Sequence, residues 1–411
     1  MKNNSQEVLI VGSGFAGLIS AIMLKNANIS CKLFEANPEI ETSGDRLTIF
    51  TNSMKVMRLI GVADEVITKG FILEVLKFQD NHGKLMVNRS MGKKSAYGEP
   101  TVTIKRSKLH KIILEKAEKL GVEIIYGKKV IGVSENSTSV NLVFEDGTDY
   151  SGSFVIGCDG INSFVRRSVL NKDISPNYLG LVYFGGFVHN QELIKKLKLE
   201  EKTVYVSVGP ANFFTYSYLK SREGSGNDTI HWNCFLSQPE RLRKVELDRL
   251  QDKEVTERVL NVFARWNNPI EEIIENTSEV WKTSLSDIVE IESWSRGRII
   301  VIGDAAHAMS PLLGQGAGTA MEDAYALARL LEKFDGDYNL AFSELEKLRK
   351  PRTTLIAKRA RKNSKRTIVE FNNFATKLRN KAFSLINYLT PEKYQNKIQL
   401  YDIEKELNKI K

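Results

Sequence analysis

Three short apolar runs in the chain each end in a glycine-containing turn. The runs cover residues 8–11, 154–157 and 298–302, and their length and composition are typical of buried strands. Segments with apolar residues at helical spacing follow the first and the last of these turns. Another apolar run, residues 31–34, comes directly after the first helical segment. The pattern therefore predicts an α/β fold that begins with a βαβ unit.

The middle of the chain, residues 175–290, has a different pattern. Alternation with a period of two predicts strands of one antiparallel sheet, and turn-forming and helical segments connect them. The predicted elements are strands at 178–189, 203–208, 213–220 and 229–235, a hairpin loop at 221–228 and a helix at 253–266. Aromatic residues are concentrated here, whereas a lone histidine such as His231 is best explained as structural.

The last part, from residue 339, is helical and strongly basic, with Pro351 as an expected interruption. Its densest basic cluster, residues 358–366, is most simply a solvated helix face, with contact to a membrane surface as the alternative. The predicted organisation is a first part of the α/β domain at 1–174, an inserted sheet at 175–290, a second part of the α/β domain at 291–335 and C-terminal helices at 336–411.

Composition narrows the classes of protein. The 411 residues are 42% hydrophobic and 27% charged, which is ordinary for a globular protein. No apolar stretch approaches the ~20 residues that span a bilayer, and residues 1–7 do not form a signal peptide. Three cysteines far apart, with no metal-ligand spacing, favour a cytoplasmic protein without a metal site. The net charge of +9 raises nucleic acid as a partner, but no nucleic-acid-binding motif supports it.

The first turn has the dinucleotide-binding pattern. Gly12, Gly14 and Gly17 lie between strand and helix, and Glu35 follows the second strand. The glycines allow a tight turn and close approach of a pyrophosphate to the helix N-terminus, while the acid can bind a ribose hydroxyl. This pattern alone does not distinguish FAD from NAD.

The last turn decides between the two cofactors. A strand ends at Gly303 and Asp304, and after Pro311 the glycine-rich turn at residues 314–318 opens a helix. A helix N-terminus with close backbone access favours negative charge, such as the edge of a reduced flavin ring. This arrangement therefore favours FAD.

These motifs resemble those of the FAD-dependent aromatic hydroxylases, the single-component flavin monooxygenases. Residues 303–323, GDAAHAMSPLLGQGAGTAMED, match the second FAD motif of the family, although Gly318 stands where asparagine is frequent. Residues 157–166 resemble the family's DG motif, and Arg106 matches an arginine that reaches the FAD diphosphate. Residues 43–52 match only loosely a segment beside the flavin.

The resemblance implies a para-hydroxybenzoate-hydroxylase-like fold, in which a Rossmann-like FAD-binding domain carries an inserted substrate sheet and C-terminal helices. Together with the turns, it assigns these residues to the FAD site: Gly12, Gly14, Phe15, Ala16, Gly17, Glu35, Ala36, Arg46, Arg106, Asp159, Gly303, Asp304, Pro311, Gly314, Gln315, Gly316, Ala317 and Gly318. Candidate substrate contacts among the sheet aromatics are Phe184, Tyr205, Phe214, Tyr216 and Trp232.

The resemblance also implies a reaction. NADH or NADPH, bound transiently, reduces FAD; O2 then forms a flavin hydroperoxide, which transfers one oxygen atom to an aromatic or other electron-rich small molecule. No residue pattern identifies the catalytic groups or the substrate, and the enzyme is expected to be a monomer or a homodimer. Two alternatives stay open: a related FAD-dependent reductase or oxidase of the geranylgeranyl reductase type, and a non-catalytic flavin- or ligand-binding protein.

Overall fold

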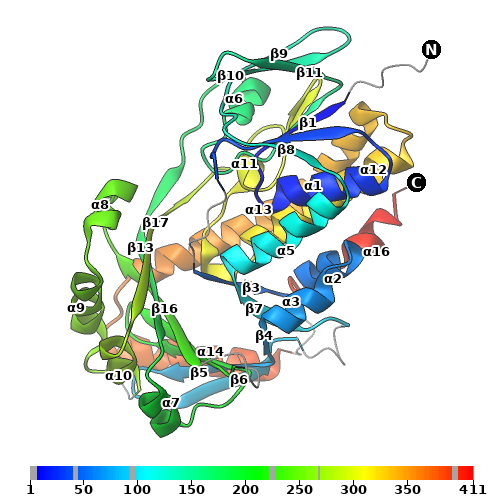
Figure 1. Cartoon of the computed structure of the whole chain (residues 1–411). Helices are drawn as coiled ribbons and strands as arrows, with labels where there is room; N and C mark the ends of the chain where they lie inside the picture. Colours follow the sequence, from blue (N-terminus) through cyan, green and yellow to red (C-terminus); the bar gives the residue numbers. More distant parts are fainter. Residues whose placement is uncertain are drawn as a thin grey trace.

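The computed structural model describes residues 7–39, 45–92, 98–221, 228–266, 269–390 and 397–410. Within these residues the chain forms two main parts joined by a long helix (Figure 1). Most of the hairpin loop predicted at 221–228, and the start of the segment at 43–52, lie outside the described residues.

The first part is built on a six-stranded sheet in the order β18-β19-β12-β1-β2-β8. The strands from β19 to β8 are parallel, and only β18 is antiparallel to its neighbour. Their bounds are β1 Val8–Val11, β2 Cys31–Phe34, β8 Glu123–Ile125, β12 Val155–Gly157, β18 Ser295–Arg296 and β19 Ile299–Val301. Because parallel strands end at the same sheet edge, the turns after β1, β2, β12 and β19 meet there.

Helices and small sheets cover this sheet. One face packs against a core that includes α1 and α12, and the other against the sheet β9–β11. The elements around the sheet are α1 Phe15–Asn26, β3 Arg46–Ile49, α2 Thr51–Leu59, α3 Ala63–Lys69, β4 Phe71–Leu73, β7 Thr101–Lys105, α5 Arg106–Lys119, β9 Val130–Glu135, β10 Val140–Phe144, β11 Asp149–Gly152, α6 Val165–Leu170, α11 Asp304–His307, η1 Pro311–Leu313 and α12 Gly316–Lys333.

The second part is a seven-stranded sheet in the order β17-β13-β16-β15-β14-β5-β6. It comprises β5 Val75–Asp80, β6 Leu85–Ser90, β13 Asn177–Val188, β14 Thr203–Val208, β15 Phe213–Leu219, β16 Thr229–Ser237 and β17 Glu279–Asp287. All neighbours are antiparallel except β5 and β14. The four strands predicted at 178–189, 203–208, 213–220 and 229–235 pair antiparallel as expected. Two further strands, β5 and β6, come from before residue 175, and β5 pairs with β14 in parallel.

The two faces of this sheet have different neighbours. The rear face packs against α9 and α10 in one apolar core, and the front face turns toward the first part, where Leu312 of η1 packs against it. Around the sheet lie α7 Gln191–Leu197, α8 Lys244–Arg249, α9 Asp252–Phe263 and α10 Ile270–Glu275. The front face is thus the one that a ligand in the first part can meet.

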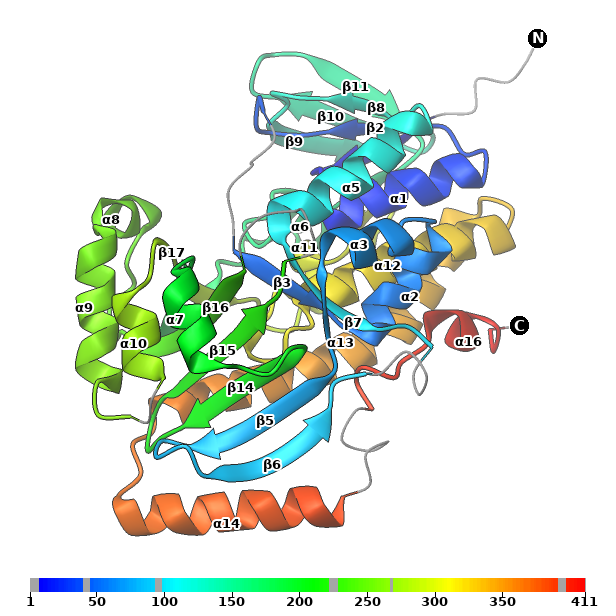
Figure 2. The same cartoon turned by 60° about the horizontal axis from the view of Figure 1, so that its bottom comes forward.

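The C-terminal region confirms the helical prediction but not the interruption. Helix α13, Tyr338–Ile368, continues through Pro351 and packs against α12 and β13. The proline costs one backbone hydrogen bond, but the buried side chains of Arg349, Thr353 and Ile356 hold the helix on both sides of it. Two further helices follow: α14 Asn373–Leu389, which lies along β5 and β6 (Figure 2), and α16 Ile403–Leu407.

Candidate functional site

The turn after β1 has the predicted close approach of backbone to backbone. Gly12 has a φ of 99°, and a Cβ on Gly17 would lie 1.9 Å from the Gly12 carbonyl oxygen. A Cβ on Gly14 would meet nothing within 4 Å. The turn therefore requires glycine at Gly17 for its own folding and leaves space at Gly14 for a phosphate, with Phe15 and Ala16 starting α1.

Glu35 is fixed at the end of β2. Its Oε2 accepts hydrogen bonds from the Ser13 amide (2.9 Å) and the Ser13 hydroxyl (2.7 Å), and its Oε1 accepts from the Asn37 amide (2.9 Å). The neighbouring Ala36 is exposed. The carboxylate is therefore held in position beside the phosphate turn before any ligand binds.

The DG motif, which the sequence assigns to the FAD site through Asp159, forms a turn after β12 that is held by backbone hydrogen bonds. The Asp159 carboxylate accepts from the Phe164 and Val165 amides at 2.7 and 3.0 Å, so it caps α6. Burial raises the pKa of Asp159, and these hydrogen bonds oppose the rise. Its contribution to an FAD site is therefore to hold the turn after β12 in place. Arg106, by contrast, is exposed, and its guanidinium lies 5.2 Å from the centre of the Phe15 ring beside the phosphate turn.

The corner after β19 presents a free carboxylate and an open helix end. Asp304 is exposed, and a Cβ on Gly316, the first residue of α12, would meet only Met309 at 3.8 Å. Gly303, Pro311, Gly314 and Ala317 complete this corner. At Gly318 a side chain would hinder helix packing, because an added Cβ would lie 2.2 Å from the Ser53 hydroxyl. Glycine at this position therefore lets α12 approach α2.

A buried ionic network lies behind this corner. Asp323 of α12 accepts from Arg349 Nε at 2.8 Å and lies 2.5 Å from His307 Nε2. Glu322 pairs with Arg349 at 2.5 Å and with Arg352 at 2.9 Å. The sequence indicated the acid at 323 but not its partners, because Arg349 lies on another helix.

Two amides connect the network to the glycine-rich turn. The Asn52 amide donates to Gln315 Oε1 at 3.1 Å and to Glu322 Oε1 at 2.7 Å. Asn52 Oδ1 and Gln315 Nε2 remain buried without a protein partner. Such groups are costly unless a ligand or water satisfies them, so the turn at Gln315 is consistent with a polar ligand.

A second cluster lies where the front face of the sheet meets the first part. The Tyr183 hydroxyl donates to Asp45 Oδ2, and His231 Nε2 lies 2.9 Å from Asp45 Oδ1. Sequence alone assigned His231 a structural role and did not single out Asp45. These residues are 186 positions apart, and no local pattern brings them together.

Arg46 lies next to this cluster. Its guanidinium lies 4.6 Å from the Phe71 ring centre and 5.5 Å from that of Phe187. Burial lowers the pKa of Arg46 to about 10, and the Asp45 charge opposes the decrease. Its Nε and Nη1 have no hydrogen-bond partner. The predicted position near flavin or substrate is compatible with this placement.

The five predicted substrate aromatics lie elsewhere. Phe184, Phe214, Tyr216 and Trp232 are buried in the rear-face core, and Tyr205 packs against the same core. The alternation correctly separates two faces, but the larger aromatics fill the core under α9 and α10. Side chains that face the first part, including Tyr183, His231, Phe213 and Phe235, replace them as candidates for substrate contact.

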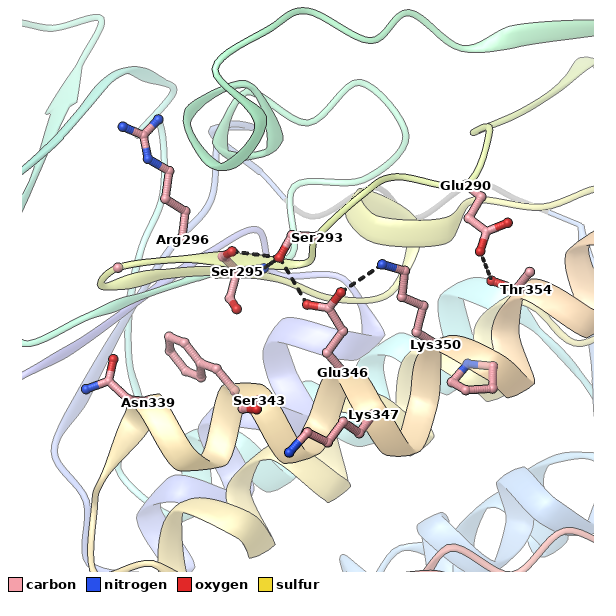
Figure 3. Close-up of a pocket in the computed structure, with 13 residues that line it drawn as sticks. Glu290, Ser293, Ser295, Arg296, Asn339, Ser343, Glu346, Lys347, Lys350 and Thr354 are labelled. Carbon is pink, nitrogen blue, oxygen red and sulfur yellow. Dashed lines mark hydrogen bonds and ion pairs between the residues drawn. The ribbon is translucent and has the colours of Figure 1, made fainter.

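A cavity of about 630 Å³ opens between α13 and the loop before β18, and Figure 3 shows it. Its lining includes charged and hydroxyl side chains: Glu346 accepts from Ser293 Oγ at 3.1 Å and pairs with Lys350 at 2.8 Å. None of its lining residues belongs to the turns at 12–17, 157–166 or 303–318. It is therefore separate from the candidate FAD site.

Comparison with known proteins agrees with this geometry. The family described as "FAD binding domain" matches residues 5–336. The chain belongs to this family of FAD-dependent monooxygenases. The 3-amino-4-hydroxybenzoate 2-monooxygenase PtmB3 of Streptomyces platensis is 30% identical over 88% of both chains. Aurachin C monooxygenase/isomerase of Stigmatella aurantiaca is 30% identical, covering 79% of this chain and 80% of its own.

Solved structures share the fold. Klebsiella pneumoniae HpxO complexed with FAD and uric acid superimposes with a TM-score of 0.78 at 22% identity, covering 98% of this chain and 95% of that chain. A salicylate hydroxylase substrate complex gives a TM-score of 0.78 at 21% identity over 99% and 98% of the two chains. The predicted family, the para-hydroxybenzoate-hydroxylase-like fold and FAD as cofactor are confirmed.

The residues present in this flavoenzyme fit FAD. An open phosphate turn, a preset carboxylate and a free carboxylate come together at one sheet edge, as an extended dinucleotide requires. Glu35 and Asp304 would bind hydroxyl groups of the cofactor, Gly14 and Arg106 its diphosphate, and residues 314–318 the flavin ring.

Proposed function

We propose that this monooxygenase uses NAD(P)H and O2 to hydroxylate a small aromatic compound that carries an ionisable hydroxyl group. The observation that supports this most directly is the hydrogen-bonded cluster of Asp45, Tyr183 and His231 on the front face of the sheet. The names of relatives, such as 3-amino-4-hydroxybenzoate 2-monooxygenase and 6-hydroxynicotinate 3-monooxygenase, support a hydroxylated aromatic acid.

When bound, FAD would supply the redox chemistry, in which a hydride from NAD(P)H and one atom of O2 are used to hydroxylate the substrate and the other oxygen atom leaves as water. The chain's own residues prepare the substrate. A substrate hydroxyl against Tyr183 transfers its proton toward the Asp45 carboxylate, which Tyr183 and His231 hold in position. Loss of the proton makes the aromatic ring more electron-rich and so more reactive toward electrophilic oxygen.

The surroundings of the cluster suit an aromatic anion. Phe235 packs edge-on against Tyr183 with ring centres 5.3 Å apart, and the ring centres of Phe187 and His231 are 5.1 Å apart. These rings exclude water and present flat apolar surfaces. The unpaired nitrogens of Arg46 add positive charge beside Asp45 and favour a substrate carboxylate.

The decisive experiment compares two tyrosines of the same sheet in the FAD-loaded enzyme. Tyr183→Phe and Asp45→Asn should lower kcat/KM for a phenolic substrate by about 10²–10⁴-fold, the usual contribution of a general base. NAD(P)H oxidation should continue and release hydrogen peroxide instead of product. The matched control is Tyr216→Phe, which removes a rear-face hydroxyl bonded to Gln79 and should leave the kinetics unchanged.

The starting point for this comparison is a screen of aromatic acids for stimulated NAD(P)H oxidation, with product mass raised by one oxygen atom. Loss of activity in Tyr216→Phe but not in Tyr183→Phe would refute the front-face site. Double-bond reduction without oxygen uptake would instead favour the reductase alternative. We further propose a cytoplasmic enzyme, monomeric or homodimeric, in which any membrane contact runs through the C-terminal helices.

A further inference from the structure

Helix α14 turns most of its large apolar side chains away from the protein. A helix that rests on a sheet normally buries its apolar face and exposes its polar face. In α14 the arrangement is reversed, and six large side chains are between 58% and 86% exposed: Phe374, Leu378, Leu385, Ile386, Tyr388 and Leu389. Figure 2 shows α14 at the outside of the molecule, beneath β5 and β6.

The inner face of α14 fixes this orientation. Arg379 donates to the Gly209 carbonyl at 2.8 Å, and Thr376 is buried. Phe383 packs edge-on against Phe78 of β5, with ring centres 5.1 Å apart. Since these contacts hold the polar side inward, the apolar side cannot turn toward the sheet without breaking them.

The charge on α14 distinguishes between possible partners. Lys377 and Lys381 are exposed beside the apolar residues, and the helix sequence contains no acidic residue. Two copies packed face to face would bring these lysines together without a carboxylate from either helix. Anionic lipid headgroups would pair with the lysines, and the acyl boundary would take the apolar side chains.

We propose that α14 is an interfacial helix that docks this enzyme on the surface of an anionic lipid bilayer. Within the part of the chain that the structure describes, no helix is long and apolar enough to cross a membrane. The helix therefore lies in the plane of the interface. The predicted basic cluster at 358–366 is a poorer surface, because Arg361 pairs with Asp287 and Ser364 is buried.

The test uses the full FAD-loaded chain and sedimentation with vesicles. Wild type should sediment with phosphatidylglycerol–phosphatidylcholine vesicles, and less with phosphatidylcholine alone or at high salt. Replacing two exposed leucines, Leu378→Ser with Leu385→Ser, should weaken binding about 100-fold, at about tenfold for each apolar side chain lost from the interface. Lys377→Gln with Lys381→Gln should remove the preference for anionic vesicles.

The matched control replaces two apolar side chains exposed elsewhere, Val245→Ser on α8 with Leu340→Ser on α13. It should bind like wild type, and bound FAD should be unchanged in all variants. Equal binding of the α14 serine variant and wild type would overturn the proposal, as would failure of wild type to bind anionic vesicles. Sedimentation equilibrium gives a further outcome. If wild type is a dimer, the α14 serine changes dissociate it and no vesicle binding is seen, the apolar face of α14 contacts a second copy of the chain instead.

Discussion

Two carboxylates at strand ends prepare the cofactor site in different ways. Glu35 is already held by Ser13 and Asn37, whereas Asp304 is exposed and free. We predict that Glu35→Ala and Asp304→Ala each weaken FAD binding, because each removes a charge-assisted hydrogen bond worth roughly 1.5–3 kcal/mol. This corresponds to a loss of about 10- to 150-fold in affinity by fluorescence titration.

The exposed surface acid Glu240 is a suitable control, and Glu240→Ala should bind FAD with the affinity of wild type. Glu35→Ala should also loosen the phosphate turn, since Ser13 loses its acceptor. If both site variants bind FAD with unchanged affinity, these two carboxylates do not contact the cofactor.

Two glycines near the start of α12 should respond differently to substitution. Gly316 has room for a Cβ, so Gly316→Val should fold and remain yellow. The branched side chain of the introduced valine would displace the flavin ring from the helix N-terminus. That helix end favours the negative charge of reduced flavin. We predict a lower flavin reduction potential and little hydroxylation, measured by potentiometric titration.

Gly318→Val provides the contrast, because its Cβ would meet the Ser53 hydroxyl at 2.2 Å. That variant should lose stability through the α12–α2 contact. A flavin-loaded Gly316→Val with an unchanged potential would show that the turn does not control the ring.

At the scale of elements, α12 and α13 are joined through buried charges. Burial alone would raise the pKa values of Glu322 and Asp323, but Arg349 and Arg352 lower the pKa of Glu322, and His307 and Arg349 lower that of Asp323. A carboxylate with a lowered pKa stabilises the fold above its unfolded pKa of about 4, and this contribution is lost as the pH falls through the folded pKa.

We predict that Arg349→Met destabilises the protein by about 3–5 kcal/mol at pH 7, because it takes from buried Glu322 its main counter-charge and leaves buried Asp323 with His307 alone. The pKa values of Glu322 and Asp323 should then rise, so protonation at lower pH should relieve the cost. The difference in thermal midpoint between variant and wild type should shrink as the pH approaches 4. Arg329→Met, at an exposed pair with Glu332, should change the midpoint little at any pH.

The elements show what local sequence could predict. The turns at 12–17 and 303–318 could be predicted because the glycines and the adjoining strand and helix patterns are neighbours in the sequence. The structure confirms both turns. The pairing of β5 with β14 is not local, and nothing near residue 75 predicts it. The sequence predicts that Pro351 interrupts the C-terminal helical region, but tertiary packing of Arg349 and Thr353 overrides that preference.

The candidate site shows the same difference between what local sequence predicts and what long-range packing decides. Alternation along β15 and β16 gives two faces, but which face is core depends on helices α9 and α10, which come later in the chain. For that reason the predicted aromatics proved to be core, while Asp45, Tyr183 and His231, from three separate strands or strand ends, were missed. The ionic partners of Asp323 were missed for the same reason.

At the scale of the whole molecule, the candidate FAD site joins segments that the inserted sheet separates in sequence. The phosphate turn at 12–17 and the ring turn at 314–318 are brought together by the parallel sheet and by the packing of α1 against α12. A ligand that bridges them should therefore stabilise the native state. We predict that FAD at 100 times its Kd adds about 2.7 kcal/mol, or roughly 3–5 °C in thermal midpoint, relative to protein stripped of FAD.

Cofactor fragments show whether the stabilisation arises from bridging. FMN carries the ring and one phosphate but no adenosine, so it reaches the turn at 314–318 without reaching Glu35. At equal concentration it should raise the midpoint less than FAD does. In Glu35→Ala the FAD shift should fall toward the FMN shift, while the FMN shift itself stays unchanged, because only the adenosine half loses a partner. If FMN shifts the midpoint as much as FAD, or if Glu35→Ala reduces both shifts equally, then Glu35 does not bind the adenosine half and the turns do not act as two ends of one site.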